Sequence, residues 1–171
     1  MARREVYRLT VGSLLLALSL VIPLTMGGVP WLSLSIGPFT ATPASHVPLM
    51  LSMLFGPVVS GIVGFGSALG FFLKLGPVVG MRAAMHIPVG VLGALLLKKK
   101  VSFPLTLAIV APLHAFLEAL VVLPFGFTLQ KAGYVVGIGT LVHHTVDSAI
   151  AIFCWGLLFT KTGAFKGVHT E

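Results

Sequence analysis

The chain has little charge. Only 9% of its 171 residues are Asp, Glu, Lys or Arg, whereas 57% are hydrophobic. Average globular chains carry roughly 25% charged residues. With 11 basic and 4 acidic residues, a soluble domain of this size cannot cover its surface. We therefore expect the apolar residues to face lipid and interpret residues 1–171 as a single integral membrane domain.

Cysteine, linkers and enzyme motifs are scarce or missing. Cys154 is the only cysteine and lies in an apolar run, which excludes a disulfide framework and a cysteine-based metal site. The sequence shows no Ser/Gly linker and no repeat array. It also contains no GxSxG, HExxH or P-loop pattern. We therefore expect no enzyme activity and no ATP hydrolysis by a P-loop in this chain.

The net charge of +7 does not indicate a nucleic-acid-binding protein. The basic residues stand at the ends of apolar runs, where membrane topology requires them. The first 27 residues resemble a signal peptide, with a basic start and an apolar run. However, the run from Leu9 to Met26 is long for a signal sequence and has no small-x-small cleavage site. We expect it to be a retained first helix.

Five apolar regions are long enough to cross a bilayer, which takes about 20 residues. They are Leu9–Met26, His46–Leu73, Met81–Leu97, Phe103–Phe125 and Val135–Phe159. The second is too long for one helix and carries Gly56-Pro57 in its middle. It is therefore either one kinked helix or two helices joined by a tight turn, since proline favours a helix start.

The distribution of positive charge favours two helices. With a split at Gly56-Pro57, the N-terminal arginines, Lys98-Lys99-Lys100 and the tail lysines all lie on the cytoplasmic side, as the positive-inside rule expects. The basic residues placed inside are Arg3, Arg4, Arg8, Lys98, Lys99, Lys100, Lys161 and Lys166, and those placed outside are Lys74, Arg82 and Lys131. The sequence thus predicts an all-α membrane protein with six transmembrane helices and both termini inside. The approximate helix bounds are 8–27, 40–56, 57–74, 81–97, 102–125 and 135–160.

The second predicted helix is a special case. The stretch from His46 to Phe55 is too short to cross about 30 Å of hydrocarbon at 1.5 Å per residue. Either the helix begins earlier, near Thr40, or its outer end lies inside the protein. Irregular backbone at membrane depth is tolerated only where it is buried in protein or lines a cavity.

Ionisable residues converge on one side of the predicted membrane protein. The predicted topology places them in the outer half of the second, fourth, fifth and sixth helices, and leaves the inner halves almost without them. They are His46, Arg82, His86, His114, Glu118, His143 and Asp147. Ionisable groups within spans are costly and usually functional. The pattern predicts a polar pocket that opens outward.

Simpler structural roles remain open for single members of this set. Arg82 can extend to the membrane surface along its aliphatic stem. Glu118 can be a structural partner of Arg82 or of a histidine, and Asp147 can fix helix packing by bonding His143. His143 and His144 point in different directions on a helix, so we expect only one of them to face the pocket.

A metal site is the weaker interpretation of the histidines. Three or four histidines with a carboxylate can bind zinc or nickel. However, no HxxxH or HxxEH pattern occurs on a predicted helix. We therefore predict no metal and no cofactor.

Aromatic residues surround the predicted pocket in the outer loops. Trp31 and Phe39 lie in the loop 27–45, Phe127 and Tyr134 in the loop 125–134, and a third loop covers 74–80. Aromatic rings above polar groups suit a flat heteroaromatic ligand. For Trp31 and Tyr134 the alternative is the ordinary aromatic belt at the membrane interface.

Two motifs give the chain a resemblance to a known family. Ser13-Leu-Leu-Leu-Ala17 is similar to an Ala-x-x-x-Ala contact motif, with Ser13 as a conservative departure, and residues 46–70 resemble a short helix followed by Gly-Pro and a further helix. Together with size and topology, these motifs resemble the substrate-binding S-components of energy-coupling factor (ECF) vitamin transporters. The resemblance covers nearly the whole chain.

The resemblance implies a multi-pass protein of a prokaryotic plasma membrane that captures a vitamin outside the cell. It would dock through its first helix, at Ser13 and Ala17, on the transmembrane coupling protein EcfT, which two cytoplasmic ATPase subunits drive. It would then rotate in the lipid bilayer to release the vitamin inward. The chain looks closest to the subset that handles pyridoxine, hydroxymethylpyrimidine or niacin. Arg82 could pair with the carboxylate of niacin, whereas Glu118 and Asp147 could accept hydrogen bonds from pyridoxine hydroxyls.

The expected substrate-binding residues combine the polar cluster with the aromatic residues above it. They are Trp31, Phe39, His46, Arg82, His86, His114, Glu118, Tyr134, His143 and Asp147. The alternative function is a stand-alone proton-coupled carrier or channel that uses Glu118, Asp147 and the histidines as a relay. A relay should extend through the membrane, and the apolar inner halves argue against it. A purely structural subunit would leave the converging polar groups unexplained.

Overall fold

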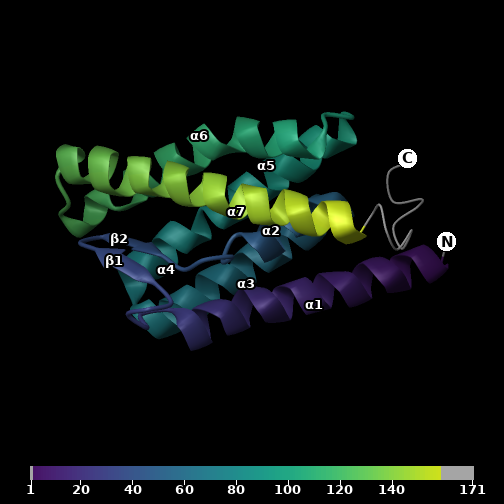
Figure 1. Ribbon diagram of the computed structural model, residues 1–171, viewed down its shortest axis with the longest axis horizontal. Helices are drawn as coiled ribbons and strands as arrows, with labels where there is room; N and C mark the ends of the chain where they lie inside the picture. Colours follow the sequence, from purple (N-terminus) through teal and green to yellow (C-terminus); the bar gives the residue numbers. More distant parts are fainter. Residues whose placement is uncertain (1, 159–171) are drawn as a thin grey trace.

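Helices dominate the chain, with one short hairpin between the first two of them (Figure 1). The computed structural model describes residues 2–158, with side chains from Glu5 onward. Its elements are α1 (Ala2–Met26), β1 (Leu34–Ile36), β2 (Phe39–Ala41), α2 (Val47–Ser52), η1 (Met53–Phe55), α3 (Pro57–Leu75), α4 (Pro77–Ala84), α5 (His86–Lys98), α6 (Phe103–Val121), η2 (Leu123–Phe125), η3 (Lys131–Gly137) and α7 (Ile138–Gly156). The segments η1 and η2 are 3₁₀ turns, and η3 is a π-helical turn that runs into α7.

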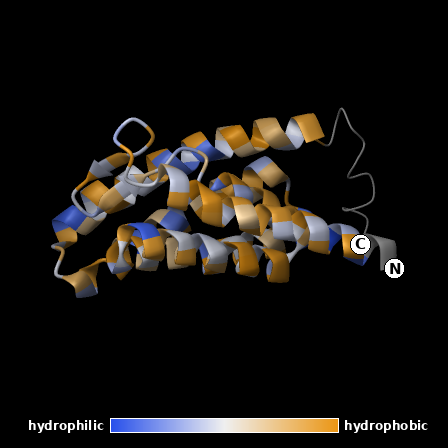
Figure 2. Ribbon diagram, turned by 90° about the horizontal axis from the view of Figure 1, so that it is seen from below, coloured by the Kyte–Doolittle hydropathy of each residue, from blue (hydrophilic) through white to orange (hydrophobic). Residues whose placement is uncertain are grey.

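Within the described residues, five helical segments are long and apolar enough to cross a membrane. They are Glu5–Met26, Pro57–Leu75, Pro77–Lys98, Phe103–Phe125 and Lys131–Gly156. Only 17% to 44% of the residues in these segments are buried inside the protein, so most of their apolar side chains face outward, toward lipid. Figure 2 shows hydrophobic residues along most of each helix. The membrane class predicted from the sequence is confirmed, whereas the six-span count and the N-in/C-in orientation stay predictions.

The second predicted helix is much shorter than the range 40–56. Residues 39–41 form β2, and the helix begins only at Val47. The α2–η1 segment ends at Phe55, and Gly56 turns the chain with a φ of 102° before Pro57 starts α3. The expected tight turn at Gly56-Pro57 is therefore present. Of the two explanations for the short helix, an earlier start near Thr40 is wrong, and its outer end lies inside the protein.

The hairpin follows from its turn residues. Leu34–Ile36 pairs antiparallel with Phe39–Ala41, with Ile36 opposite Phe39. Gly37 has a φ of 58°, the positive value that a two-residue hairpin turn with glycine in first position requires. Phe39 is buried while Leu34 and Ile36 are exposed. The hairpin thus lays β2 on the helices and keeps β1 outside.

The fourth predicted helix, 81–97, corresponds to two consecutive helices, α4 and α5. The predicted loop 74–80 shrinks to a turn at Gly76, since Pro77 already begins α4. A short break at Met85 then separates α4 from α5. Because α4 starts early, Arg82 lies in a helix packed on α3 rather than at the membrane surface.

Close helix contacts position the bundle around α3. A Cβ on Gly70 would lie 2.7 Å from Pro23 Cγ, and one on Gly66 would meet the Leu16 side chain. The small residues at these positions therefore let α1 and α3 approach closely, as in other membrane helix pairs. Arg8 donates from Nη2 to the carbonyl oxygen of Phe55 at 2.7 Å, which ties the start of α1 to the end of η1.

The bundle has two distinct ends (Figure 1). The β1–β2 hairpin lies at one end, and the start of α1 and the end of α7 lie at the other. We call the part next to the hairpin the hairpin half and the opposite part the basal half. The predicted inside lysines Lys161 and Lys166 and the last residues of the predicted helix 135–160 fall outside the described residues.

Candidate functional site

Glu118, on α6, is the centre of a buried polar network in the hairpin half. Its Oε2 accepts hydrogen bonds from Arg82 Nε at 3.0 Å, Arg82 Nη2 at 2.6 Å and Thr140 Oγ1 at 2.6 Å. Its Oε1 lies 3.2 Å from His114 Nε2. Glu118 is 3% exposed and Arg82 4%. A two-point guanidinium–carboxylate contact satisfies both buried charges, which would otherwise be very costly.

Arg82 also connects this network to the hairpin. Its Nη1 donates to the carbonyl oxygen of Pro38 at 2.9 Å and to Thr40 Oγ1 at 3.4 Å. The guanidinium lies 5.2 Å from the centre of the Phe39 ring, within cation–π range. The interpretation of Arg82 as a residue that extends to the membrane surface is therefore wrong. The hairpin covers the polar network, and Arg82 holds it there.

Histidine rings gather around His46, which precedes α2. The centre of its ring lies 4.7 Å from that of His86, 4.8 Å from His114 and 4.5 Å from His143, all edge to face. Burial lowers the pKa of His46 well below 6.5, and the neighbouring histidines lower it further. His46 lies outside the five spanning segments, and its ring is neutral at neutral pH.

Asp147, on α7, holds the start of α2. Its Oδ1 accepts from the backbone N–H of Ala44 and its Oδ2 from that of His46, both at 2.9 Å. His46 itself offers no side-chain cap to α2. His143, one turn before Asp147, contacts Ser45 Oγ at 3.2 Å and Asp147 Oδ2 at 3.4 Å. A carboxylate from another helix therefore replaces the missing local cap, which explains how so short a helix is stable.

Polar contacts between ring nitrogens and their partners continue behind the cavity. His114 Nδ1 lies 3.0 Å from His144 Nδ1, and His144 Nε2 lies 3.2 Å from the carbonyl oxygen of Leu107. His86 Nδ1 contacts Ser67 Oγ at 2.9 Å. His114 and His144 are both fully buried. The network thus reaches α3, α5, α6 and α7.

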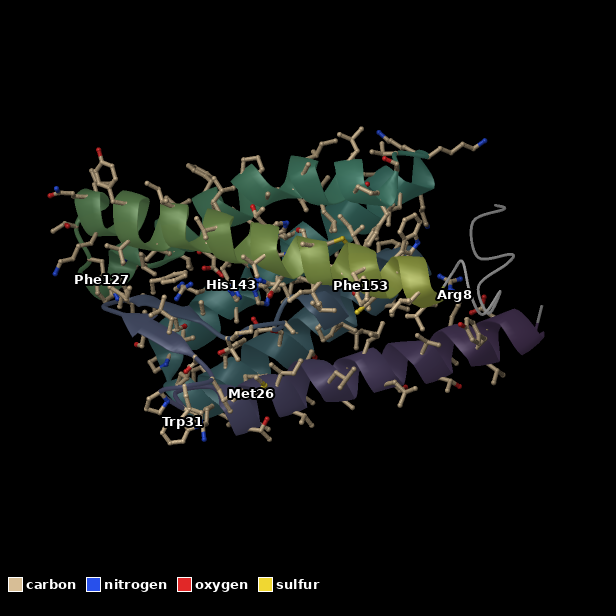
Figure 3. The ribbon with its side chains drawn as sticks, viewed as in Figure 1. Arg8, Met26, Trp31, Phe127, His143 and Phe153 are labelled. Carbon is tan, nitrogen blue, oxygen red and sulfur yellow. The ribbon has the colours of Figure 1, made fainter. Side chains whose placement is uncertain are left out.

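The polar groups line a small cavity. Its volume is about 20 Å³, which is room for about one water-sized group. The cavity is lined by Thr40, Thr42, Ser45, His46, Phe71, Val79, Arg82, Ala83, His86, Glu118, Thr140 and His143. Figure 3 labels His143 beneath α7, about midway along the bundle. Thr40 of β2 forms part of the wall, so the hairpin lies over one side of the cavity. That the pocket opens to the outside of the cell stays a prediction.

Most of the predicted site residues come together here. The structure joins Phe39, His46, Arg82, His86, His114, Glu118, His143 and Asp147 in one network. It does not bring Trp31 or Tyr134 to them, since Trp31 is 83% exposed and Tyr134 68% exposed. Trp31 lies near the hairpin end in Figure 3. The aromatic-belt alternative for these two rings stays a prediction.

Two residues of the network, Thr140 and His144, were not among the substrate-binding residues expected from the sequence. Thr140 and His144 are 1% and 2% exposed and bond Glu118 and His114 respectively. A signal for Thr140 existed, because it precedes His143 by three residues and Asp147 by seven and so shares their helix face. Of the adjacent histidines, His143 lines the cavity as expected, but His144 is also part of the network, one layer deeper.

The predicted docking residues lie on α1, which contributes none of the residues that line the cavity. Ser13 and Ala17 are exposed on the outward face of α1. The same helix exposes Val6, Leu9, Leu14, Leu18 and Val21. This face is available to lipid or to another membrane protein.

One comparison with known proteins identifies a relative of the chain. The chain is 35% identical over 167 residues to the niacin transporter NiaX of Lactococcus lactis subsp. cremoris, strain MG1363. The match covers 88% of this chain and 73% of that protein. No family model and no solved structure matches the chain.

Proposed function

The chain belongs to the same family as the niacin transporter NiaX, as a membrane subunit of the S-component type, and from this premise we propose that it captures niacin. It is a multi-pass protein of a prokaryotic plasma membrane. The buried Arg82 at the cavity carries the proposal of a carboxylate-bearing ligand. Pyridoxine and hydroxymethylpyrimidine have no carboxylate for this arginine to recognise.

The carboxylate of niacin enters by exchanging partners with the groups already on Arg82. Two donors of Arg82 point to Glu118, and Nη1 points to Pro38 and Thr40. An incoming carboxylate takes over the Nη1 side, where the present acceptors are a carbonyl and a hydroxyl oxygen. The carboxylate brings a full negative charge to the guanidinium and can bind it at two points, so this exchange favours the bound ligand.

The hairpin has to move for the ligand to enter. A pyridine ring with its carboxylate is larger than the cavity of about 20 Å³, which holds about one water. The contacts of Arg82 Nη1 with Pro38 and Thr40 fasten the hairpin over the cavity. Exchange of these contacts for the ligand's carboxylate releases the hairpin. We propose that the hairpin opens and closes in this way with each capture event.

The import cycle requires partners. The chain carries no P-loop, so ATP hydrolysis belongs to other subunits. We propose that the exposed face of α1 around Ser13 and Ala17 docks on EcfT and that two cytoplasmic ATPases drive the release of the vitamin. The apolar, small-residue character of this face supports a helix–helix contact in the membrane.

The proton-coupled carrier has less support. Within the described residues, the buried ionisable side chains lie in the hairpin half, and the buried polar residues of the basal half are hydroxyl-bearing, such as Ser52 and Ser60. A proton pathway would need titratable groups or water across the whole membrane thickness. The basal half is instead filled by Met53, Phe55 and Phe103.

The test is ligand binding to the detergent-purified protein, by calorimetry and thermal shift. We expect nicotinate to bind tightly, with nicotinamide, pyridoxine and hydroxymethylpyrimidine much weaker. Arg82→Gln should weaken nicotinate binding by about 30-fold or more, because losing one partner of a buried charge pair costs about 2 kcal/mol or more. Lys131→Gln is the matched control, since Lys131 is exposed in the hairpin half.

The wild-type selectivity keeps the test decisive if Arg82→Gln does not fold. Preference for pyridoxine over nicotinate would overturn the assignment of niacin. Absence of any vitamin binding together with proton flux in liposomes would overturn the S-component function in favour of the carrier.

A further inference from the structure

We propose that His46, His86, His114 and Glu118 form a binding site for one divalent transition-metal ion beside the ligand cavity. One donor atom from each of the four residues lies within 4.8 Å of the others. All four side chains are at least nine-tenths buried. Three imidazoles and a carboxylate are donors that Zn²⁺, Co²⁺ and Ni²⁺ accept.

Two ring nitrogens at this place lack a hydrogen bond among the described residues. His86 Nε2 is buried, and the nearest acidic oxygen is Glu118 Oε1 at 3.8 Å. His46 Nδ1 is also buried and lies 3.1 Å from Asp147 Oδ2 without hydrogen-bond geometry. A buried polar atom without a partner costs about 1–3 kcal/mol. Coordination of a metal beside Glu118 Oε1 would remove that cost for His86 Nε2.

The hydrogen-bond chain behind the pocket points to the same conclusion. The carbonyl oxygen of Leu107 can only accept, so His144 Nε2 carries the hydrogen. A neutral His144 then accepts at Nδ1, and His114 donates from its own Nδ1. In a neutral His114, Nε2 therefore carries a lone pair and no hydrogen, and this nitrogen lies 3.2 Å from Glu118 Oε1. Two acceptors at this distance repel, unless a cation binds both of them.

The distances suit a metal ion. Bonds of 2.0–2.2 Å in a tetrahedral site place neighbouring donor atoms about 3.4 Å apart. The separations from Glu118 Oε1 are 3.2 Å to His114 Nε2 and 3.8 Å to His86 Nε2. Side-chain shifts of a few tenths of an ångström would bring these three atoms to a common ion, and the His46 donor atom lies within 4.8 Å of them.

The side-chain atoms of these residues that would not face the ion have hydrogen-bond partners, as is usual around metal sites. Metal-ligating histidines almost always bond through their other ring nitrogen, which fixes ring and tautomer. Here His86 Nδ1 contacts Ser67, and His114 Nδ1 contacts His144. Arg82 and Thr140 hold Glu118 Oε2, which leaves Oε1 toward the histidines.

The charge of the buried network also calls for a cation. With neutral histidines, the buried ionisable side chains of the described segment are Arg82, Glu118 and Asp147, which together leave one negative charge. A divalent ion changes this to one positive charge. A monocarboxylate vitamin then makes the site neutral. This last step rests on the proposed function, and it makes the vitamin carboxylate a further ligand of the ion.

The first test needs no vitamin. We would purify the protein without a histidine tag, remove metals with a chelator and titrate with Co²⁺ alone. We expect about one ion per chain, as for a single closed site, with the intense visible bands of four-coordinate cobalt and a raised melting temperature. Added Zn²⁺ should displace the cobalt. Absence of stoichiometric Co²⁺ and Zn²⁺ binding would overturn the metal site.

Two variants locate the ion. His86→Gln should weaken Co²⁺ binding by more than about 100-fold, because even outer partners of metal sites contribute about 10–100-fold. His143→Gln is the matched control, since His143 shares the cavity but not the four-residue group. Loss of cobalt in His143→Gln and retention in His86→Gln would overturn the assignment. If His86→Gln does not fold, X-ray absorption of the wild-type cobalt protein must show three imidazoles, and fewer would overturn it.

Nicotinate is added last. A change in the cobalt bands on its addition supports direct ligation of the ion. Cobalt binding with unchanged bands, together with tight nicotinate binding, would overturn the link to the vitamin but not the metal site. Cobalt binding without nicotinate binding would contradict the proposed function alone.

Discussion

The two halves of the bundle use the same helices but bury opposite kinds of side chain. The hairpin half encloses an arginine, two carboxylates and five of the described histidines around a small cavity. The basal half is closed by Met53, Phe55, Phe103 and Leu107, each at most 3% exposed. Polar groups in a dry interior are stable only when they bond one another.

The difference between the halves indicates two separate roles. The hairpin half carries the groups for ligand binding, and the basal half closes the bundle by apolar packing. In the hairpin half, each buried charge depends on a specific partner, so small changes should disturb both stability and ligand recognition. In the basal half, packing alone carries stability, and changes there should leave recognition untouched. Three substitutions test this comparison, and they follow in order of expected loss of stability.

Glu118→Ala should have the largest effect. It leaves the Arg82 guanidinium, now paired at 2.6 Å, buried without a counter-charge. Removal of one partner of a buried ion pair costs about 3–5 kcal/mol. The free energy of unfolding in detergent, measured with a chemical denaturant, checks this value.

The matched control for this loss is the double variant Arg82→Met with Glu118→Leu. It should recover most of the stability, because apolar replacement of a buried pair is often neutral or stabilising, and yet bind no nicotinate. A loss below about 1 kcal/mol in Glu118→Ala, the level of a surface salt bridge, would contradict a buried ion pair at this position.

Met53→Ala should have an intermediate effect on stability and none on recognition. Met53 is 1% exposed in the basal half, and its sulfur occupies the space beside Gly93. Truncation of a buried methionine to alanine costs about 2–5 kcal/mol, partly through the cavity that it leaves, and we expect the lower part of this range. The nicotinate dissociation constant of the folded protein should stay unchanged.

Leu105→Ala is the matched control for packing, because Leu105 is 54% exposed at the same end of the bundle. It should change the unfolding free energy by less than about 0.5 kcal/mol. A loss of nicotinate affinity in Met53→Ala would show that the two halves are not separate in function.

Ser13→Trp should have the smallest effect on stability and the largest on transport. Ser13 is exposed on α1, and its hydroxyl bonds only its own helix, at Leu9. Stability and nicotinate binding should change little, within about 0.5 kcal/mol for a surface site. Uptake of labelled nicotinate by cells that express the whole transporter should be lost, because the large ring blocks a close helix contact.

Val146→Trp is the control for this experiment, since Val146 is 51% exposed on the outward face of α7. It should leave uptake intact. Normal uptake in Ser13→Trp would exclude this part of α1 as the docking face.

Several properties of the protein follow from the sequence alone. Low charge and long apolar runs determine a membrane protein, because few other solutions bury such runs. Gly56-Pro57 determines a turn between two helices, because glycine accepts the positive φ and proline starts the next helix. The positions of the ionisable residues along each run also predict that Arg82, Glu118 and Asp147 converge on one half of the bundle.

Other properties depend on contacts between distant segments, which no local pattern contains. The length of α2 is set by β2 before it and by Asp147, which caps it from a helix about 100 residues away. The deeper role of His144 depends on its contact with His114 across the bundle. The four proposed metal ligands come from the segment before α2, from α5 and from α6. Their donor atoms meet only after the helices pack, and for this reason only the tertiary structure could bring the site together.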